Sequence, residues 1–358
     1  MAHHGSRRTV SGCVASSRIE GLEVGARPLL RAEAAIDLGE QPSDATAAEV
    51  LANIEAMASA IKQIGPGDPI TVDILLGFHR RLLTGTRRDA HAGRIRTEQN
   101  WIGGSDYNPC SATFVPPPPE LVGSLLEDRC SFCNDDALPA VAQAALAHSQ
   151  FETIHPFVDG NGRTGRALIH LVLRRRRLAR PVLPPISLVL AAWAKDYVDG
   201  LQATRYRGPA SSVAARDGIN LWVARFAAAC RRTVADASSF EEKARQLQDE
   251  WRSKLGPVRA HSSTDQLLKA LPGAPVMTVS SAAALIGRTF APANEAIKRL
   301  AEAGILKPIK VGLRNRAFEA PDVIEAFTAL ESRLASPAGD TRTSELSRRV
   351  PYRQEASS

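Results

Sequence analysis

The stretch from residue 155 to residue 166, His-Pro-Phe-Val-Asp-Gly-Asn-Gly-Arg-Thr-Gly-Arg, constrains the fold of this 358-residue chain most strongly. It follows a run over residues 139–154 that has the spacing of a helix. Pro156 cannot continue that helix, and it disfavours the α conformation in the residue before it. We therefore expect His155 at the end of a helix, exposed to whatever the following loop binds.

A tight turn and a second helix are predicted directly after this histidine. Gly160 and Gly162 let the backbone turn with positive φ. An amphipathic run begins near Arg163, and its apolar stripe consists of Ala167, Leu168, Leu171 and Val172. The free N–H groups and the dipole at the start of a helix favour an anion, and consecutive amides in such a turn form an anion-binding nest. The sequence thus predicts an anion site between the two helices.

The charged side chains of this stretch suit a metal-bound polyphosphate. Asp159 offers a hard oxygen ligand, and Mg²⁺ is usually held by one or two carboxylates together with substrate phosphates. Arg163 and Arg166 lie three residues apart on one helix face, and each can bind phosphate oxygens in a fork. Histidine is the side chain whose ordinary pKa suits a general base near neutral pH, which makes His155 the candidate base.

These residues resemble the signature of the Fic family, His-Pro-Phe-x-[Asp/Glu]-Gly-Asn-Gly-Arg-x-x-Arg, in nine of twelve positions. The resemblance implies a mainly α protein, with an all-helical Fic (Fido) core and a short β-hairpin flap. It also implies an enzyme in which a histidine deprotonates a Ser, Thr or Tyr hydroxyl of a target protein. That oxygen attacks the α-phosphate of ATP, pyrophosphate leaves, and AMP stays on the target. Such a transfer depends on positioning and charge neutralisation.

The resemblance assigns a role to each position of the motif. His155 is the expected base and Asp159 the expected Mg²⁺ ligand, while Arg163 and Arg166 are expected to hold the β- and γ-phosphates. Phe157 is expected to anchor the loop in the core without taking part in chemistry. The motif residues expected to bind the nucleotide are Gly160, Asn161, Gly162, Arg163, Thr164, Gly165 and Arg166.

A second motif lies near the N-terminus. The run Ser-Ser-Arg-Ile-Glu-Gly over residues 16–21 resembles the inhibitory motif of Fic proteins, [Ser/Thr]-x-x-x-Glu-[Gly/Asn]. The resemblance implies that Glu20 pairs with Arg166 and blocks productive placement of the γ-phosphate. The alternative is an ordinary surface glutamate at a helix end.

Residues 93–121 resemble the flap of Fic enzymes, a short hairpin over the active site. A short alternating pattern over residues 95–99 is ended by Gly103-Gly104, and the prolines of 116–119 favour extended backbone. The resemblance implies that the flap aligns the target backbone by β-strand addition. The residues expected to position the target are Thr97, Glu98, Gln99, Asn100, Trp101 and Ile102. The alternative is a plain surface hairpin with Trp101 packed beneath it.

Two further side chains are interpreted by their place in helical runs. Tyr197 lies in a run over residues 188–203, and by resemblance it approaches the adenine of the nucleotide. Packing of Tyr197 in the core or at an interface is the alternative. His148 is expected to be a packed or hydrogen-bonded helix residue.

The C-terminal part of the chain predicts a second unit. Helices are expected over residues 264–271, 278–287 and 290–303, followed by a basic hairpin over 307–318. This order resembles a winged helix-turn-helix, a common companion of bacterial Fic cores. Such a fold can bind DNA with its third helix in the major groove, and it can equally serve as an interaction or dimerisation module.

The whole chain is predicted to contain several parts. The expected division is an N-terminal helical region over residues 1–65 that carries the inhibitory motif, a Fic core over 66–235, a helical linker over 236–261, the winged helix-turn-helix-like unit over 262–335, and a disordered tail over 336–358.

Composition excludes some classes of protein. Arginines 174–177 interrupt the longest apolar helix candidate, and no secretory signal begins the chain, so we expect a cytoplasmic protein with no membrane partner. The five cysteines are scattered, and the pair Cys130 and Cys133 lacks a second pair, so structural reduced thiols are expected. The net charge of +7 is explained in part by the basic helix end at 174–177, although a basic surface can also attract nucleic acid.

The leading hypothesis is an ATP- and Mg²⁺-dependent protein adenylyltransferase that is restrained by Glu20 and acts on a hydroxyl of a target protein or on itself. A de-AMPylase, or a transferase of another nucleotide or of phosphocholine, is the alternative enzyme. A DNA-binding regulator that uses the C-terminal unit is the alternative from a different class.

Overall fold

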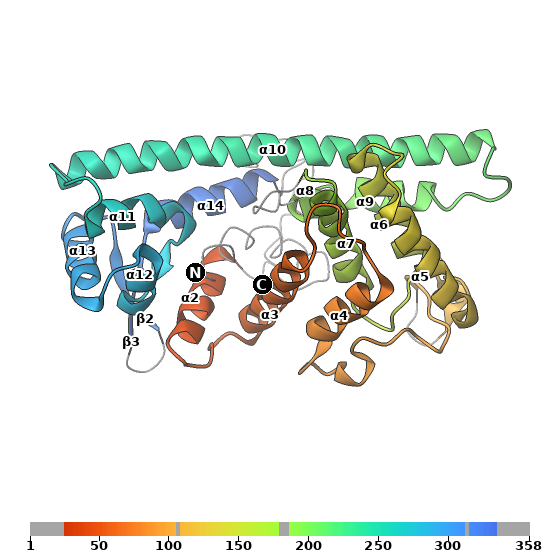
Figure 1. Cartoon of the computed structure of the whole chain (residues 1–358), viewed down its shortest axis with the longest axis horizontal. Coiled ribbons are helices and arrows are strands. Elements are labelled where there is room, and N and C mark those ends of the chain that lie inside the picture. The colour runs from red at the N-terminus through yellow and green to blue at the C-terminus, as the bar shows by residue number, and fades with distance from the viewer. Residues whose placement is uncertain (1–24, 105–107, 179–185, 312–314, 335–358) are drawn as a thin grey trace, which may run out of the picture.

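The computed structural model describes residues 25–104, 108–178, 186–311 and 315–334, which form a mainly helical protein with one small antiparallel sheet (Figure 1). The first part of the chain contains α2 (Ala26–Asp37), α3 (Ala45–Lys62), α4 (Val72–Leu83), the short 3-10 helices η1 (Asp89–His91) and η2 (Pro109–Ser111), α5 (Pro119–Asn134), α6 (Ala140–Ile154) and α7 (Asn161–Arg175). The middle part contains α8 (Ile186–Ala192), α9 (Ala194–Ala203) and α10 (Val213–Leu255). The last part contains α11 (Ser263–Ala270), η3 (Leu271–Gly273), β1 (Val276–Met277), α12 (Val279–Ile286), α13 (Phe290–Glu302), β2 (Lys307–Val311), β3 (Asn315–Glu319) and α14 (Pro321–Leu334).

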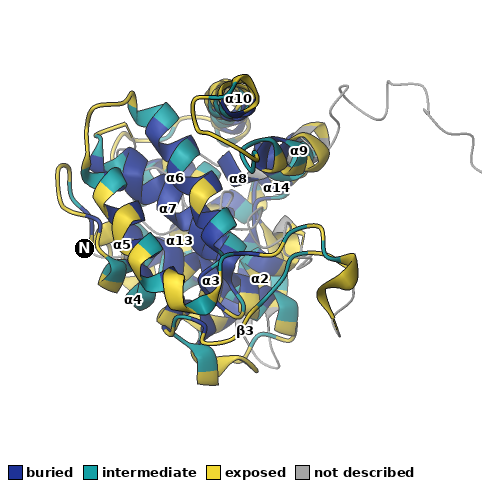
Figure 2. Ribbon diagram, turned by 90° about the vertical axis from the view of Figure 1, so that its right-hand side faces the viewer, coloured by how far each residue is buried: buried dark blue, intermediate teal, exposed yellow. Residues whose placement is uncertain are grey.

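Helices α6 and α7 form the centre of the larger core. They pack closely on each other, α6 also packs on α5 and α10, and α7 packs on α3 and α4. The ribbon of α6 and α7 is mostly in the colour of buried residues (Figure 2), and these residues belong to the larger apolar core. Trp222 of α10 is fully buried there, and its indole N–H donates to the carbonyl of Ala145 at 2.7 Å. The two helices predicted around residue 155 therefore lie at the buried centre of the larger core.

The 43-residue helix α10 runs along the whole molecule (Figure 1). The sequence analysis placed a boundary here, between the core over residues 66–235 and a helical linker over 236–261. The helix crosses this boundary because no proline or glycine lies between Gly218 and Gly256 to interrupt it. Ser212 caps the helix by accepting from the N–H of Ala215 at 3.2 Å, and Gly256 ends it with φ of 65°. One end of α10 packs Trp222 into the larger core, and the other packs Trp251 into a second core.

The C-terminal unit, residues 263–334, contains the helices and the hairpin that the sequence predicts. Thr278 and Ser281 form a reciprocal capping box at the start of α12, and Gly287 ends that helix in the left-handed conformation. The sheet has the order β1-β3-β2, and β2 pairs with β3 over residues 307–311 and 315–319. Trp251 closes the unit against α14 by donating from its indole N–H to Asp322 at 2.9 Å. Its interpretation as a winged helix-turn-helix stays a prediction.

Helix α2 packs against the C-terminal unit. Ala34 and Ala35 lie in a small apolar cluster with Val276, Ala317 and Ile324. Beside this cluster the buried carboxylate of Glu319 accepts from Arg27 at 3.2 Å and from Arg31 at 3.3 Å. The first described helix and the last domain-like unit of the chain are therefore in direct contact. No described helix is long and apolar enough to cross a membrane.

Substitution by alanine is expected to have opposite effects on stability at two helical glycines. A Cβ at Gly218 of α10 would lie 2.0 Å from the carbonyl oxygen of Ala203, whereas a Cβ at Gly123 of α5 would meet nothing within 4 Å. We expect Gly218→Ala to destabilise the fold by about 1–3 kcal/mol because the helices must separate. Gly123→Ala is the matched control and should stabilise it by about 0.5–1 kcal/mol through helix propensity. Urea unfolding of both variants measures the difference, and equal effects would contradict the close packing of α9 on α10.

Candidate functional site

The loop after α6 has the predicted form. His155 ends the helix with φ of 48° and ψ of 60°, outside the right-handed α region as Pro156 requires. Gly160 turns the chain with φ of 76° and is the N-cap of α7, which begins at Asn161. The expected positive φ at Gly162 was wrong, because this residue already lies in the first helical turn. The loop thus leads directly into a helix N-terminus.

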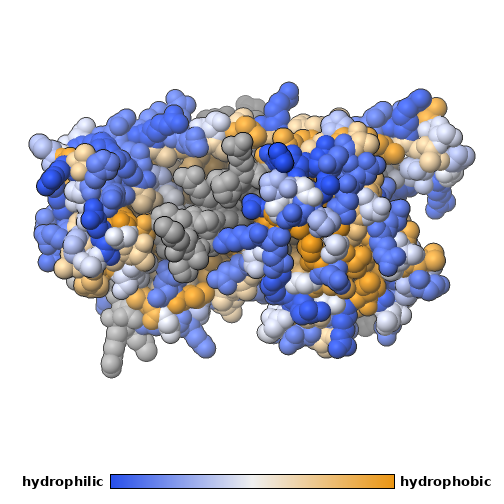
Figure 3. All heavy atoms as spheres, viewed as in Figure 1, coloured by the Kyte–Doolittle hydropathy of each residue, from blue (hydrophilic) through white to orange (hydrophobic). Residues whose placement is uncertain are grey.

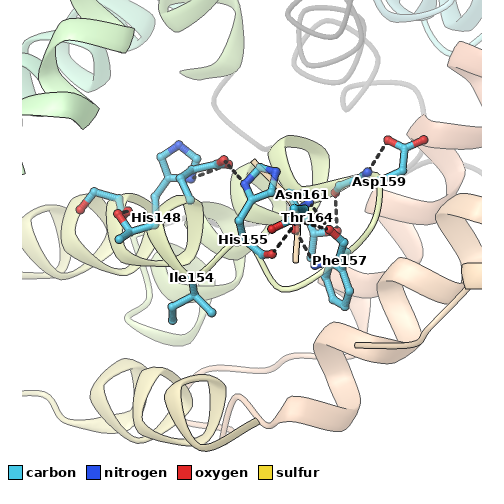
Figure 4. Close-up of polar contacts among 12 residues, drawn as sticks. His148, Ile154, His155, Phe157, Asp159, Asn161 and Thr164 are labelled. Atoms are coloured by element: carbon cyan, nitrogen blue, oxygen red, sulfur yellow. Dashed lines mark hydrogen bonds and ion pairs between the residues drawn. The ribbon is translucent and has the colours of Figure 1, made fainter. Parts of the chain in front are cut away.

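Asn161 closes the loop on itself (Figure 4). Its side-chain oxygen accepts from the N–H of Phe157 at 2.8 Å, and its side-chain N–H donates to the carbonyl of Phe157 at 2.8 Å. The hydroxyl of Thr164 donates to the carbonyl of Gly160 at 2.9 Å. Both side chains were predicted to bind a nucleotide, and their contacts here define the shape of the loop. A nucleotide-binding role for them stays a prediction.

His79 of α4 packs against the loop between α6 and α7. The sequence analysis did not single out this residue. Its ring stacks on Phe157 with centroids 3.7 Å apart, which confirms Phe157 as a core anchor. The N–H of Gly93 donates to Nδ1 at 3.0 Å, so the ring proton lies on Nε2, which donates to the carbonyl of Asp159 at 2.9 Å. Burial lowers the pKa of His79 to about 4, so the ring is neutral at pH 7.

Asp159, the predicted Mg²⁺ ligand, lies beside the first turn of α7. Its carboxylate accepts from the N–H of Gly160 at 2.5 Å and from Arg163 at 3.4 Å, and Arg88 is 4.0 Å away. The side chain is 39% exposed, so one oxygen can still face a ligand. Within the described ranges no group of three or more His, Cys, Asp or Glu could hold a metal ion. A role for Asp159 in binding Mg²⁺ stays a prediction.

A buried carboxylate, Glu152, lies between two histidines and was missed in the sequence. Its oxygens are 3.9 Å from Nδ1 of His155 and 4.0 Å from Nδ1 of His148. A Cβ at Gly165 would lie 2.5 Å from a carboxylate oxygen of Glu152, so a larger residue there would have to displace this carboxylate. Glu152 lies one helical turn before His155, and that spacing was the available signal. The close approach of α7 to α6 at Gly165 therefore depends on a residue outside the motif.

The two arginines of the motif are buried. Arg163 is 7% exposed, and besides Asp159 it reaches the side-chain oxygen of Asn53 at 3.5 Å. Arg166 is 1% exposed, and after the larger effect of burial its charge helps lower the pKa of His148 to about 3. Glu20, the predicted partner of Arg166, lies outside the described residues with the rest of the inhibitory motif.

Tyr197 packs in the core beside the site. Its ring lies 5.8 Å from His148 and 6.0 Å from Trp222, and its hydroxyl hydrogen-bonds Nε2 of His148 at 2.9 Å. These contacts confirm that His148 is a packed, hydrogen-bonded helix residue, and they favour the packing alternative for Tyr197. A contact between Tyr197 and adenine stays a prediction.

The predicted flap consists of two extended arms. A single antiparallel bridge, Ile102 to Phe114, joins them, and no longer ladder forms in the described part of the segment. The reason is that prolines 116–119 have no N–H groups to extend the pairing. Of the expected target-positioning residues, Thr97, Glu98 and Gln99 are exposed, whereas Asn100, Trp101 and Ile102 are half-buried. Asn100 donates to the carbonyls of His155 and Phe157, so it ties the flap to the loop.

Comparison with known proteins decides the family of this site. The Fic/DOC family model matches residues 69–173, the segment that runs from before α4 to the end of α7. Residues 69–173 are therefore similar to Fic/DOC-family domains. On the face shown in Figure 3, hydrophobic residues gather over this part of the molecule, which Figure 1 shows as α4 to α7.

Sequence relatives are protein adenylyltransferases. Fic-1 of Caenorhabditis elegans is 38% identical over 137 residues, which is 37% of this chain and 25% of that protein. The Fic protein of Nematostella vectensis is 37% identical over 119 residues, or 31% of this chain and 25% of that protein. The chain thus spans about a quarter of the length of the curated relatives it matches.

Solved structures support the fold over a longer span. A Fic family protein from Desulfovibrio desulfuricans G20 superimposes with a TM-score of 0.53 at 19% identity and covers 89% of this chain and 88% of its own. A Fic domain-containing signaling protein from Bacteroides thetaiotaomicron gives a TM-score of 0.51 at 20% identity, covering 64% of this chain and 85% of its own. The chain is therefore similar in sequence to Fic adenylyltransferases over about a third of its length. It shares its helical fold with these two solved Fic proteins.

Acid should destabilise this domain through its buried histidines. Burial lowers the pKa of His79 and of His170 to about 4 and that of His148 to about 3, from an ordinary 6.5. The unfolded chain therefore binds these protons more strongly, and stability falls as the pH drops from about 6.5 towards about 4. The slope should approach about 1.4 kcal/mol per pH unit for each histidine. Urea unfolding at several pH values measures it, and an unchanged stability between pH 7 and pH 5 would contradict neutral burial.

Proposed function

We propose that this protein is a nucleotidyltransferase that moves AMP from ATP to a Ser, Thr or Tyr hydroxyl of a target protein, with Mg²⁺ bound to the nucleotide. The observation that carries this proposal is the loop of residues 155–161. It ends one helix at an imidazole, closes through Asn161, and opens the next helix with free N–H groups beside Asp159. A base and an anion site are thereby held a few residues apart in one rigid turn. The adenylyltransferase relatives support the same chemistry.

In this mechanism His155 removes the proton of the acceptor hydroxyl. The oxygen then attacks the α-phosphate, the bond to the β-phosphate breaks, and pyrophosphate leaves. The buried carboxylate of Glu152, 3.9 Å from the His155 ring, stabilises the imidazolium that forms. The N–H groups at the start of α7 and the guanidinium groups of Arg163 and Arg166 neutralise phosphate charge. Asp159 would hold Mg²⁺, which supplies positive charge to the phosphate oxygens when bound.

We also propose that Glu20 restrains the enzyme by pairing with Arg166. The support is the inhibitory-motif pattern of residues 16–21 and the deep burial of Arg166. A glutamate beside this guanidinium neutralises it and takes the space that the γ-phosphate needs. Removal of AMP from a modified target, or transfer of another nucleotide, uses the same loop. Mass spectrometry of the protein and of a modified target after incubation with each nucleotide separates these reactions.

The transfer reaction gives one direct experiment. With labelled ATP and a cell lysate, we expect Glu20→Gly to raise AMP incorporation on the order of tenfold or more, as a released inhibitory coupling would. His155→Ala should lower it by about 100-fold or more because the general base is lost. His91→Ala, a histidine outside the motif, is the matched control and should keep wild-type transfer.

Two outcomes would refute parts of this proposal. Equal AMP incorporation by wild type and Glu20→Gly would contradict inhibition by Glu20. Wild-type transfer by His155→Ala would contradict the role of His155 as general base.

A second candidate function is DNA binding through the C-terminal unit. Residues 263–334 have nine Lys and Arg against seven Asp and Glu, so the unit as a whole is only slightly basic. Its positive charge gathers in the hairpin, because residues 307–318 have four Lys and Arg and no Asp or Glu. Lys298 on α13 and Lys307 and Lys310 on β2 are exposed. A recognition helix with a basic wing would neutralise DNA phosphates in this way.

Gel-shift titrations of the full chain with duplex DNA test this second function. We expect binding that weakens steeply as salt rises, and a several-fold loss of affinity in the double variant Lys298→Ala, Lys310→Ala. Lys195→Ala is the matched control, because Lys195 is an exposed lysine of α9 outside the C-terminal unit. Absence of binding at low salt would retire the DNA-binding function.

A further inference from the structure

A buried arginine, Arg96, joins the flap to the end of helix α6. The residue is 2% exposed, although it lies in an otherwise exposed arm of the flap. Its guanidinium donates to the carbonyl of His155 at 2.9 Å and to that of Ile154 at 3.4 Å. Its backbone N–H donates to the carbonyl of Pro156 at 2.9 Å. Three consecutive carbonyls at the catalytic helix end are therefore held by one residue.

The same guanidinium also holds both arms of the flap. It donates to the carbonyl of Glu98 at 3.1 Å in the first arm and to that of Pro117 in the second. Burial lowers the pKa of Arg96, and the charge of Glu120 opposes this effect. A buried charge bonded only to carbonyls is a costly arrangement for stability alone. Its value lies in the fixed fork geometry, which Lys cannot reproduce.

A second arginine anchors the far arm to the same helix. Arg205, in the loop after α9, lies over the ring of Phe114 at 3.9 Å. Its guanidinium donates to the carbonyl of Glu152 at 3.2 Å and to the hydroxyl of Thr153 at 3.4 Å. Phe114 is also the bridge partner of Ile102, so this contact fixes the place where the two arms pair. Both arms are thus tied by arginines to the last turn of α6.

We propose that Arg96 is a positioning residue, which fixes the edge of the flap relative to the His155 ring and thereby selects the hydroxyl of a docked target that meets the base. The proposal rests on the proposed transfer reaction. A target strand added along the flap advances by about 3.3 Å per residue, so a small shift of the edge changes which side chain reaches the imidazole. Misplacement by about 1 Å can cost on the order of 100-fold in rate. Arg96 touches only protein carbonyls, so it is not itself a catalytic residue.

The variant that tests this proposal is Arg96→Lys, which keeps the charge and loses the fork. We expect AMP transfer to fall by about tenfold or more, with modification spread over neighbouring hydroxyls of the target in peptide mass spectra. Affinity for ATP should change by less than about twofold, because the phosphate-binding turn is untouched. Arg94→Lys, an exposed arginine of the same arm, is the matched control and should keep the rate and the modified residue.

Hydrogen exchange tests the coupling through Arg96 independently of the proposed AMP transfer. In Arg96→Lys we expect amides of residues 94–104 and of 154–157 to exchange faster together, whether or not AMP is transferred. If wild type transfers no AMP and both segments still loosen together, the reaction fails and the coupling stands. Wild-type exchange in both segments, or an unchanged rate with a single modified residue, would overturn the proposal. Should Arg96→Lys fail to fold, Arg205→Lys loosens the other arm and is judged by the same measurements.

Discussion

The amide of Asn161 bonded to both backbone groups of Phe157 is the interaction on which the site depends. A loop of this length between two helices would otherwise leave an N–H and a carbonyl unsatisfied in the core, which costs stability. By satisfying both, Asn161 holds the chain in the shape that presents the His155 ring and the first N–H groups of α7 to the same space. The stacked, neutral ring of His79 supports this loop from the opposite side.

This arrangement lowers the stability of the fold because several charged side chains are buried. Glu152, Arg163 and Arg166 are all less than a tenth exposed, and they lie around the junction of α6 and α7. Burial of such groups weakens a fold unless they are paired or hydrogen-bonded, so a site rich in them is kept for its chemistry. Gly165 shows how tightly these helices fit, because any side chain there would displace the Glu152 carboxylate. The large apolar core around Trp222 offsets this cost and keeps the helices in register.

Much of the fold and of the loop could be predicted from the sequence because the signals were local. Pro156 ended one helix, Gly160 began the next, and Thr278 and Gly287 marked both ends of α12. Local signals failed where tertiary contact decides. Glycine can adopt the right-handed helical conformation as well as the left-handed one, and Gly162 adopts the helical one. The long helix α10 runs across the predicted boundary between core and linker. The motif roles of the nucleotide-binding residues stay predictions, since no contact in the protein alone distinguishes a phosphate cradle from a rigid turn.

The residues that escaped prediction share one physical property: each acts on backbone atoms of a distant segment. His79 holds the carbonyl of Asp159, Arg96 those of Ile154 and His155, and Arg205 that of Glu152. Every residue has a backbone carbonyl, so the residue types in a sequence do not show which carbonyl a distant side chain will contact. They nevertheless set the distance between flap, base and phosphate-binding turn. In the transfer that we propose, the motif residues hold the nucleotide and the base, while these supports outside the motif fix the place where an acceptor meets the base.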